Sequence, residues 1–417
     1  MGHVATPVVA GPLLGLLLLI APAPAPGSDG DEPADAEAPA AEAAAQPFRT
    51  DSDIDADDTP PWYQVEPGVF PPEGSAHYFS GELIALDHVN RTGVLRTDRT
   101  DRQNRSHWDL PVFFTLLPYA SMSYHNAPAA LRDIPIGTRL HGLFYLKDED
   151  DPGLTPPPGG RVSIEVDFNR AFQLEDDFTH HTRHGRAWRV DEIDEQQTTV
   201  LLTPVVADDP EQEAGEPMSF ELVPSTRVWR GAGFATLDDI EAGAVVQINL
   251  TRTTLFGPGR CLDIWLDEES RELARERQRQ RHLQHMRERG LPGWIDEVDN
   301  QQRILTITLF GGIDAELLES FTVDTNVAVV VAETSLRPHD PVNDRKFGPI
   351  LEVEQVNAGP GSSGVRIRCR PEVLLEGYRP RRIVRLYPGE WPVTDLPREE
   401  RLWPDDVAIP LAPTMER

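Results

Sequence analysis

The sequence predicts a mainly β protein of three tandem small OB-like β-barrels, joined by helical connectors and preceded by a disordered N-terminal segment. Three observations support this prediction. The chain has 417 residues, which is enough for about three domains of ordinary size. It contains 39 Pro and 31 Gly residues, so many turns are expected. The third observation is an internal repeat, which constrains the architecture more strongly than any single element does.

The repeat is clearest between residues 114–118 (FTLLP) and residues 220–224 (FELVP). The same alignment, continued without a gap, places residues 131–134 (LRDI) on residues 237–240 (LDDI). Agreement at apolar, acidic and proline positions in one register indicates two copies of one structural unit.

A second alignment indicates a third copy. Residues 191–197 (DEIDEQQ) match residues 296–302 (DEVDNQQ), and the pair at 219–220 (SF) recurs at 320–321 after a small deletion. The first copy opens with residues 81–87 (GELIALD) at nearly the same phase. Three units of about one small domain each are therefore expected.

The second copy shows the order of strands most clearly, because its apolar and β-branched runs are separated by turn-forming residues. The expected strands cover residues 187–193, 198–205, 219–223, 244–250 and 260–266. Between the third and fourth of them, Thr236 suits a helix N-cap and Gly243 suits a stop, so one helical turn fits there. The resulting order, three strands, a helix and two strands, is that of the OB-fold.

In such a barrel the short helix closes the bottom with apolar side chains. Leu237 and Ile240 are expected to do so in the second copy, as Leu131 and Ile134 are in the first. In the third copy Pro338 and Pro341 interrupt the equivalent region, so a loop is expected to replace the helix (residues 338 and 341).

Helical connectors are expected between the units. Residues 268–289 are rich in Arg, Glu, Gln and Leu and end at Gly290, as a helix would. Residues 167–184 suit a shorter equivalent. The expected segments are a signal peptide (1–26), a disordered acidic linker (27–76), barrel 1 (77–168), a connector (169–184), barrel 2 (185–267), a helical connector (268–290), barrel 3 (291–392) and a C-terminal tail (393–417).

The N-terminus predicts export to the periplasm or the cell surface. Residues 8–20 form an apolar run of the length of a signal-peptide core, and small residues follow it at Ala21, Ala23 and Ala25. The run is short for a transmembrane helix, although its flank lacks Lys and Arg, so an uncleaved anchor is the alternative. No further stretch has the apolar length of a membrane span, so none is expected in the mature chain.

Charge and cysteine content limit the partners. A net charge of -30 opposes binding to nucleic acid and to anionic membranes, which both attract Lys and Arg. The two cysteines, Cys261 and Cys369, are too few for a disulfide framework. Because they fall near the ends of different repeats, two separate buried thiols are favoured over a bridge between barrels, which export would permit.

The segment at residues 71–81 (PPEGSAHYFSG), continued by residues 87–93 (DHVNRTG), resembles a stretch of exported proteins from planctomycete-type bacteria. The resemblance covers about a tenth of the chain. It implies an exported protein with tandem OB-like repeats, and it implies no activity.

Exposed aromatic side chains on an OB face can stack on bases or sugars. Tyr119, Tyr124 and Trp229 lie around the third strand and the loop after it, so they are the candidate binding residues. Trp188 and Trp294 take similar positions in two first strands, where packing inside the barrel is the favoured interpretation.

Histidines cluster on both connectors. His180, His181 and His184 lie on the first, and His282 and His285 lie on the second. Spacing of three residues can place two imidazoles on one helical face for a metal ion. No HExxH motif and no cysteine accompanies them, so histidines on a polar surface are favoured and no metal is expected.

No nucleophile elbow, P-loop or nucleotide-binding glycine pattern is present, so no catalytic residue and no cofactor is predicted. The favoured function is a non-catalytic exported binding or scaffold protein acting through its barrels, with an envelope protein or a glycan as possible partner. One alternative is an accessory protein that binds carbohydrate or peptide. The other is a hydrolase-type enzyme with a carboxylate site between barrels. The oligomeric state and the ligand stay open.

Overall fold

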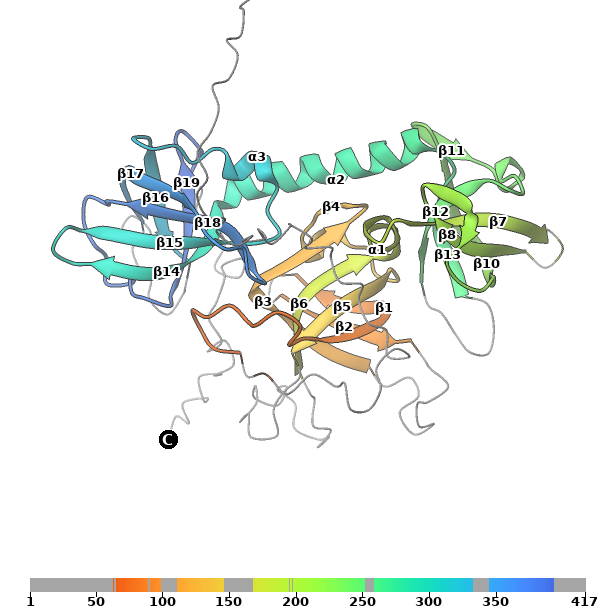
Figure 1. Ribbon diagram of the computed structural model, residues 1–417, viewed down its shortest axis with the longest axis horizontal. Coiled ribbons are helices and arrows are strands. Elements are labelled where there is room, and N and C mark those ends of the chain that lie inside the picture. The colour runs from red at the N-terminus through yellow and green to blue at the C-terminus, as the bar shows by residue number, and fades with distance from the viewer. Residues whose placement is uncertain are drawn as a thin grey trace, which may run out of the picture. The chain divides into compact units, whose positions relative to one another are not determined.

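The structure is a computed structural model that describes the folded repeats. It covers residues 63, 65–88, 91–98, 111–145, 168–194, 196, 198–251, 259–332 and 345–393. Several sequence predictions fall outside this description. They concern the signal peptide, most of the acidic linker, Pro338, Pro341 and nearly all of the C-terminal tail. Within the described residues the chain is mainly β and forms three closed small barrels, as the sequence predicts (Figure 1).

The first barrel has the strand order of the OB-fold. Its strands are β1 (His77–Asp87), β2 (Thr92–Thr97), β3 (Pro111–Tyr124), β5 (Arg139–Tyr145) and β6 (Phe168–Asp176), with the short β4 (Ala127–Pro128) beside β3. β1 pairs with β2 and β5, β5 pairs with β6, and β2 pairs with β3. The barrel closes because β3 and β6 run parallel, which is the Greek-key closure expected of this fold.

The second barrel repeats this topology. Its strands are β7 (Arg186–Asp194), β8 (Thr199–Val206), β10 (Met218–Arg230), β12 (Val245–Leu250) and β13 (Gly259–Trp265), with the short strands β9 (Asp209–Glu213) and β11 (Gly233–Ala235) at the margins. β10 and β13 are the parallel pair. Phe220 and Leu222 point into its core, as alternation along the third strand predicts.

The aligned plug segments form the same element in both barrels. They are the 3-10 turns η2 (Leu131–Asp133) and η3 (Leu237–Asp239). In barrel 1 both expected apolar residues are buried, as is Ile240 in barrel 2. Leu237 is the exception, since it is 38% exposed. The prediction that it plugs barrel 2 is wrong, because of the two residues only Ile240 lies in the core of that barrel.

The third barrel closes in a different way. Its strands are β14 (Leu291–Asp299), β15 (Ile304–Phe310), β16 (Asn326–Val331), β17 (Arg345–Gln355), β18 (Ser362–Cys369) and β19 (Ile383–Pro388), with the short helix α3 (Ala315–Leu318) after β15. The closed order is β14-β15-β18-β17-β16-β19, and every neighbouring pair is antiparallel. It is a closed small barrel like the others, but the parallel pair of the OB order is absent among its described strands.

The alignment of the second and third copies holds for the first two strands only. β7 and β14 carry a bulge at matching positions, between Val190 and Glu192 in one and Ile295 and Glu297 in the other. In both copies a threonine of the next strand donates a hydrogen bond to the aspartate inside the bulge. Residues 320–321, however, follow α3 instead of opening a third strand, so that part of the alignment is wrong.

The predicted connector at residues 169–184 is also corrected. Most of it is β6, whose Ala171 and Leu174 are fully buried in barrel 1. Only α1 (Asp177–Arg183) is helical, and it begins at the N-cap Asp176. The polar residues of this segment suggested a solvated helix, but closing the barrel requires a strand parallel to β3 at this place.

The second connector is the helix α2 (Glu268–Arg289), as the sequence predicts. Asp267 caps its first turn by accepting a hydrogen bond from the Ser270 amide, and Gly290, with a φ of 73°, ends it. Leu283 enters the core of barrel 3. On the side of barrel 1, the Gln278 amide donates to the carbonyl oxygen of Pro128 at 3.1 Å.

Barrels 1 and 3 share an apolar interface that is separate from the core of either barrel. Tyr119 is 1% exposed and lies near Trp294 and Phe310, with ring centroids 6.2 and 6.1 Å away. The backbone of barrel 3 approaches closely here, since a Cβ on Gly361 would lie 2.6 Å from the Tyr119 ring. This interface fixes the two barrels against each other and forms one side of the cavity described next.

Candidate functional site: a cationic pocket between barrels 1 and 3

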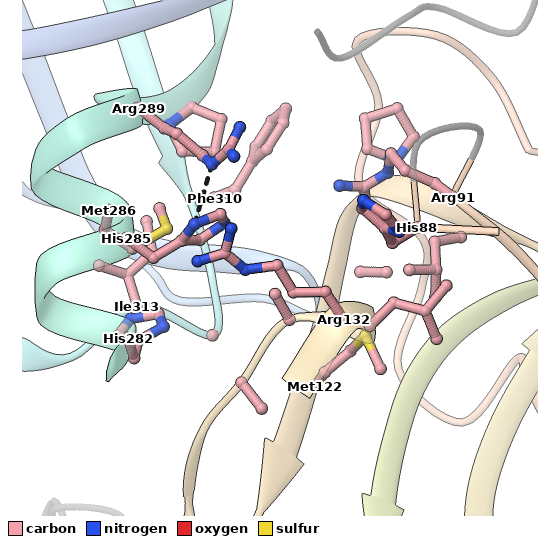
Figure 2. Close-up of a pocket in the computed structure, with 18 of the residues that line it drawn as sticks. His88, Arg91, Met122, Arg132, His282, His285, Met286, Arg289, Phe310 and Ile313 are labelled. Carbon is pink, nitrogen blue, oxygen red and sulfur yellow. Dashed lines mark hydrogen bonds between the residues drawn. The ribbon is translucent and has the colours of Figure 1, made fainter. Parts of the chain in front are cut away.

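A cavity of about 140 Å³ lies where barrel 1 meets α2 and barrel 3 (Figure 2). This is far more than the roughly 10–15 Å³ that holds one water molecule. Its wall comes from segments distant in the sequence: the β1–β2 turn, β3 and η2 of barrel 1, the last turns of α2, and the segment after β15. We call it the arginine pocket.

Two regular patterns build the wall. Leu116, Pro118, Ala120 and Met122 are alternate residues of β3, so they lie on one face of that strand. On α2 the lining residues are His282, His285, Met286 and Arg289, whose spacing of three and four residues places them on one helical face. Each set is therefore presented by a rigid element.

Glycines allow the third wall to come close. Gly311 and Gly312 follow β15 and line the pocket beside Phe310 and Ile313. Gly312 has a φ of 71°, and a Cβ at this position would lie 2.7 Å from the Cβ of Ser121 in β3. Only glycine suits both the conformation and the space.

The polar lining of the arginine pocket is cationic. Four arginines and three histidines contribute to it, and none of the described residues that line it is an aspartate or a glutamate. The cationic and imidazole residues are Arg91, Arg132, Arg289, Arg385, His88, His282 and His285. The chain as a whole has a net charge of -30, so this concentration of positive charge has the opposite sign to the net charge of the chain.

Arg91 and Arg385 face the same cavity from different barrels. Arg91 lies in the β1–β2 turn with a φ of 57° and donates to the Leu117 carbonyl oxygen at 2.8 Å. Arg385, on β19, is 7% exposed and donates to the Gly290 carbonyl oxygen at 3.0 Å. Burial, together with repulsion from Arg385, lowers the pKa of Arg91 to about 10. A bound anion would favour the charged form of Arg91 and so raise its pKa again.

The two pocket histidines on α2 are neutral. The Arg289 guanidinium donates to Nδ1 of His285 at 2.8 Å, so this nitrogen carries no proton (Figure 2). The backbone amide of Asp314 donates to Nε2 of His282 at 3.3 Å. Burial lowers the pKa of His282 to about 4, and burial with nearby arginines lowers the pKa of His285 to about 2. The permanent charge of the pocket therefore comes from arginine.

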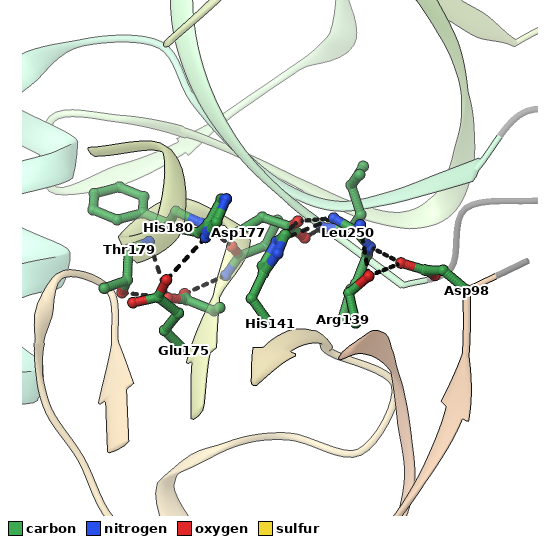
Figure 3. Close-up of polar contacts among 12 residues, drawn as sticks. Asp98, Arg139, His141, Glu175, Asp177, Thr179, His180 and Leu250 are labelled. Carbon is green, nitrogen blue, oxygen red and sulfur yellow. Dashed lines mark hydrogen bonds and ion pairs between the residues drawn. The ribbon is translucent and has the colours of Figure 1, made fainter. Parts of the chain in front are cut away.

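A second polar cluster lies between barrels 1 and 2 (Figure 3). At its centre the fully buried Asp177 forms an ion pair with Arg139 and accepts a hydrogen bond from Nε2 of His141 at 2.9 Å. Its other oxygen accepts from the backbone amide of Leu250 in barrel 2 at 3.0 Å. Arg139 also pairs with Asp98 at 2.7 Å. We call this cluster, with its neighbours on β6 and α1, the polar joint.

Most of the remaining groups of the polar joint are also paired, whereas Oε2 of Glu175 is a buried oxygen with no hydrogen-bond partner among the described residues. Asn249 of barrel 2 donates from its amide to Asp176 at 2.8 Å and accepts from the Phe178 amide at 2.8 Å. Glu175 binds His180 at 2.9 Å and Arg183 at 2.8 Å. Burial raises the pKa of Asp176 to about 6 and lowers the pKa of His180 to about 3. These contacts fasten barrel 2 to barrel 1.

The polar joint therefore acts as an internal connection. Its carboxylates are buried and bonded to groups of the chain, which leaves no open position for a substrate at Asp176 or Asp177. Among the described residues, no group of three or more His, Cys, Asp or Glu is arranged to hold a metal ion.

The aromatic candidates from the sequence do not share one surface. Tyr119 is buried between barrels 1 and 3, and Tyr124 is 4% exposed and stacks on His125 at 3.8 Å. The expected exposed surface is therefore wrong for these two rings. Trp229 is partly buried: its Nε1 donates to Asp263 at 2.7 Å, and Phe234, 70% exposed, lies 4.4 Å away. Its role in binding stays a prediction.

The structure also places the tryptophans, cysteines and histidines that the sequence singled out. Trp188 and Trp294 pack inside the protein, as expected, at 3% and 2% exposure. Cys261 and Cys369 are separate, buried and free, also as expected. The prediction of surface histidines is wrong for His282, which is 4% exposed, and for His180, which is buried and stacks on His141 with the ring planes 4° apart. The packing of α1 against barrel 1 covers His180, and the segment that includes Asp314 packs against His282.

Sequence reasoning missed the arginine pocket. One signal was present, because His282, His285, Met286 and Arg289 share a helical face on an otherwise charged helix. The arginines of barrel 1 carried no local signal.

No helix in the described part of the chain combines the length and apolar character needed to cross a membrane. Comparison of the chain with protein-family models, with curated proteins and with solved structures finds no match.

Proposed function

We propose that this chain is an exported, non-catalytic binding or scaffold protein whose arginine pocket takes a small anionic ligand. The observation that carries the proposal is the lining of that pocket. Four arginines converge on one cavity, and none of the described residues that line it is an aspartate or a glutamate, although the chain as a whole is strongly acidic. A carboxylate outside the lining, that of Asp133, pairs with Arg132 at 4.0 Å.

Electrostatics favours an anion at this place. A unit charge about 5 Å from a guanidinium gains roughly 3 kcal/mol at an effective dielectric constant of about 20. Arginine also offers a planar donor pattern that matches carboxylate and phosphate oxygens. The negative surface of the chain slows the approach of anions from a distance, so affinity has to come from contacts within the pocket.

The polar groups available support binding more than catalysis. His282 and His285 are held neutral by hydrogen bonds to Nε2 and Nδ1, so neither nitrogen is free to accept a proton from a ligand. Asp176 and Asp177, between barrels 1 and 2, are hydrogen-bonded within the polar joint, and Glu175 is 1% exposed. A hydrolase with a carboxylate site between barrels would need at least one carboxylate in an open cleft.

The scaffold part of the proposal follows from the joints between barrels. The apolar interface, the polar joint and α2 hold three barrels at set positions along one chain, and this suits a protein that presents several surfaces at once. Export to the periplasm or cell surface rests on the N-terminal apolar run and on the resemblance at residues 71–93. An envelope protein or a glycan is the partner class in keeping with that location.

Titration calorimetry on the full chain tests ligand binding, with acetate, inorganic phosphate and sulfate as probes. We expect saturable binding of at least one probe. Arg132→Gln and Arg289→Gln should each weaken it about tenfold, because each removes one pocket charge. The matched control is Arg275→Gln on the outer face of α2, where the arginine pairs with Glu272 and its side chain is 42% exposed.

Binding by the control equal to that of the unchanged chain would support the proposal. Equal weakening in all three variants would show a general charge effect, and absence of binding to every probe would overturn the proposed function.

A further inference from the structure

We infer that the ligand of the arginine pocket is a small organic anion, with one acidic head group and an apolar body of several carbon atoms. This inference rests on the proposed function and adds the chemical class of the ligand. It follows from the part of the lining that the arginines do not explain.

More than half of the lining is apolar. The face of β3 contributes Leu116, Pro118, Ala120 and Met122, and the opposite walls contribute Met286, Phe310 and Ile313. A site for a bare inorganic anion needs donors on all sides, because every oxygen of phosphate or sulfate loses water on entry. Here a large share of the wall can offer only van der Waals contact.

Charged and apolar side chains alternate around the pocket, so a ligand with an acidic group and an apolar body can contact both kinds at once. Figure 2 shows Arg91 and His88 on the barrel 1 side and Arg289 with His285 on α2, while Arg132 extends from barrel 1 toward the helix. Met122 lies beside Arg132, and Met286 lies one turn from Arg289 on the same helical face. An acidic head held by the arginines therefore places its attached carbons against methionine.

Methionine at two of these positions fits such a body. Its unbranched thioether adapts to the shape of an apolar group and contacts it without a fixed geometry. Met122 is 4% exposed and anchored in the core of barrel 1, whereas Met286 is only partly buried and packs beside the core of barrel 3. The adaptable contact is thus at Met286, on the wall opposite β3.

The test uses one head group and a growing body. Calorimetry on the full chain with acetate, butanoate and hexanoate should show affinity rising with length. Each fully buried methylene strengthens binding about fourfold, so hexanoate should bind at least tenfold more tightly than acetate even if part of its chain stays in water. Methyl phosphate and hexyl phosphate repeat the comparison with a second head group and show which acid the pocket prefers.

Met286→Gln keeps the length of the side chain and makes it polar. It should remove most of the advantage of hexanoate over acetate, measured as the ratio of the two affinities within the same variant. Met218→Gln is the matched control, because Met218 opens β10, is 41% exposed and lies outside the pocket lining.

The outcomes distinguish failure of the inferred ligand class from failure of the proposed function. Affinity that rises with chain length and depends on Met286 supports the inference. Affinity that is the same for acetate and hexanoate overturns it and leaves the proposed function standing. No binding of any carboxylate or phosphate overturns both.

Discussion

Replacing Arg91 by methionine should stabilise the empty protein and weaken anion binding at the same time. Loss of water around the Arg91 guanidinium, together with repulsion from Arg385, lowers the pKa of Arg91 to about 10, more than two units below its ordinary value. At 1.36 kcal/mol per pKa unit, the charged form is destabilised by about 3 kcal/mol. Arg91 is partly exposed, so solvent reduces this figure to roughly 2–3 kcal/mol.

The substitution also has a cost. The Leu117 carbonyl oxygen loses the hydrogen bond from Arg91, which is worth about 1 kcal/mol. Arg91→Met should therefore stabilise the chain by roughly 1–2 kcal/mol. Removing one guanidinium from the pocket should cost about the same in binding, which is a tenfold weakening or more.

The assay pairs urea unfolding of the empty chain with calorimetric titration of the anion that binds best. Arg275→Met on the outer face of α2 is the control, and it should change stability by less than about 0.5 kcal/mol. An Arg91→Met chain that is less stable and binds the anion with unchanged affinity would refute the reasoning, since Arg91 would then be a structural residue.

Three further predictions concern the joints between barrels. Because burial lowers the pKa of His180 and His181 to about 3 and of His282 to about 4, the unfolded chain binds more protons below pH 6.5, so stability should fall between pH 7 and pH 5 by up to about 2 kcal/mol per imidazole. Protonation of Asp176, whose pKa is raised to about 6, favours the folded state and offsets about 1 kcal/mol of this loss by pH 5, so a urea midpoint that rises on acidification would contradict the prediction. Gly312→Ala should destabilise the contact of barrels 1 and 3 by about 1–3 kcal/mol and weaken anion binding, because the new Cβ would lie 2.7 Å from the Cβ of Ser121. Gly359→Ala is the control and should change neither stability nor binding, because no atom of a described residue beyond its chain neighbours lies within 4 Å of the position of its Cβ. Asn249→Ala should cost about 2–3 kcal/mol in urea unfolding, because it leaves the Phe178 amide without its acceptor and removes one of the donors to the buried Asp176, which keeps those from His125 and Thr179. The exposed Asn326→Ala should be near neutral, and similar midpoints for the two variants would contradict the role of the polar joint.

Much of the fold was predictable because it depends on local patterns. Phe220 and Leu222 alternate along one strand, and strand pairing between neighbours follows from such alternation. The repeat made the evidence stronger, since residues 131–134 and 237–240 form the same turn in two barrels. Prediction was wrong at β6, where parallel pairing with β3 prevailed over a polar composition typical of a surface helix.

The candidate site was not predictable in the same way. Arg91 and Arg385 belong to different barrels and reach one cavity only because Tyr119 and Phe310 pack those barrels together. Nothing local to either arginine distinguishes it from the other arginines of an arginine-rich chain.

By itself the sequence determined that there are three small β units, that the first two share one topology, and that a long helix precedes the third. These features depend on the period of apolar residues and on turn chemistry, which act over a few residues. Only the tertiary structure decided how the third barrel closes, which histidines are buried, and that arginines from separate units share one cavity. The reason is that burial and charge are properties of surfaces brought together from distant parts of the chain, and packing between whole barrels sets them.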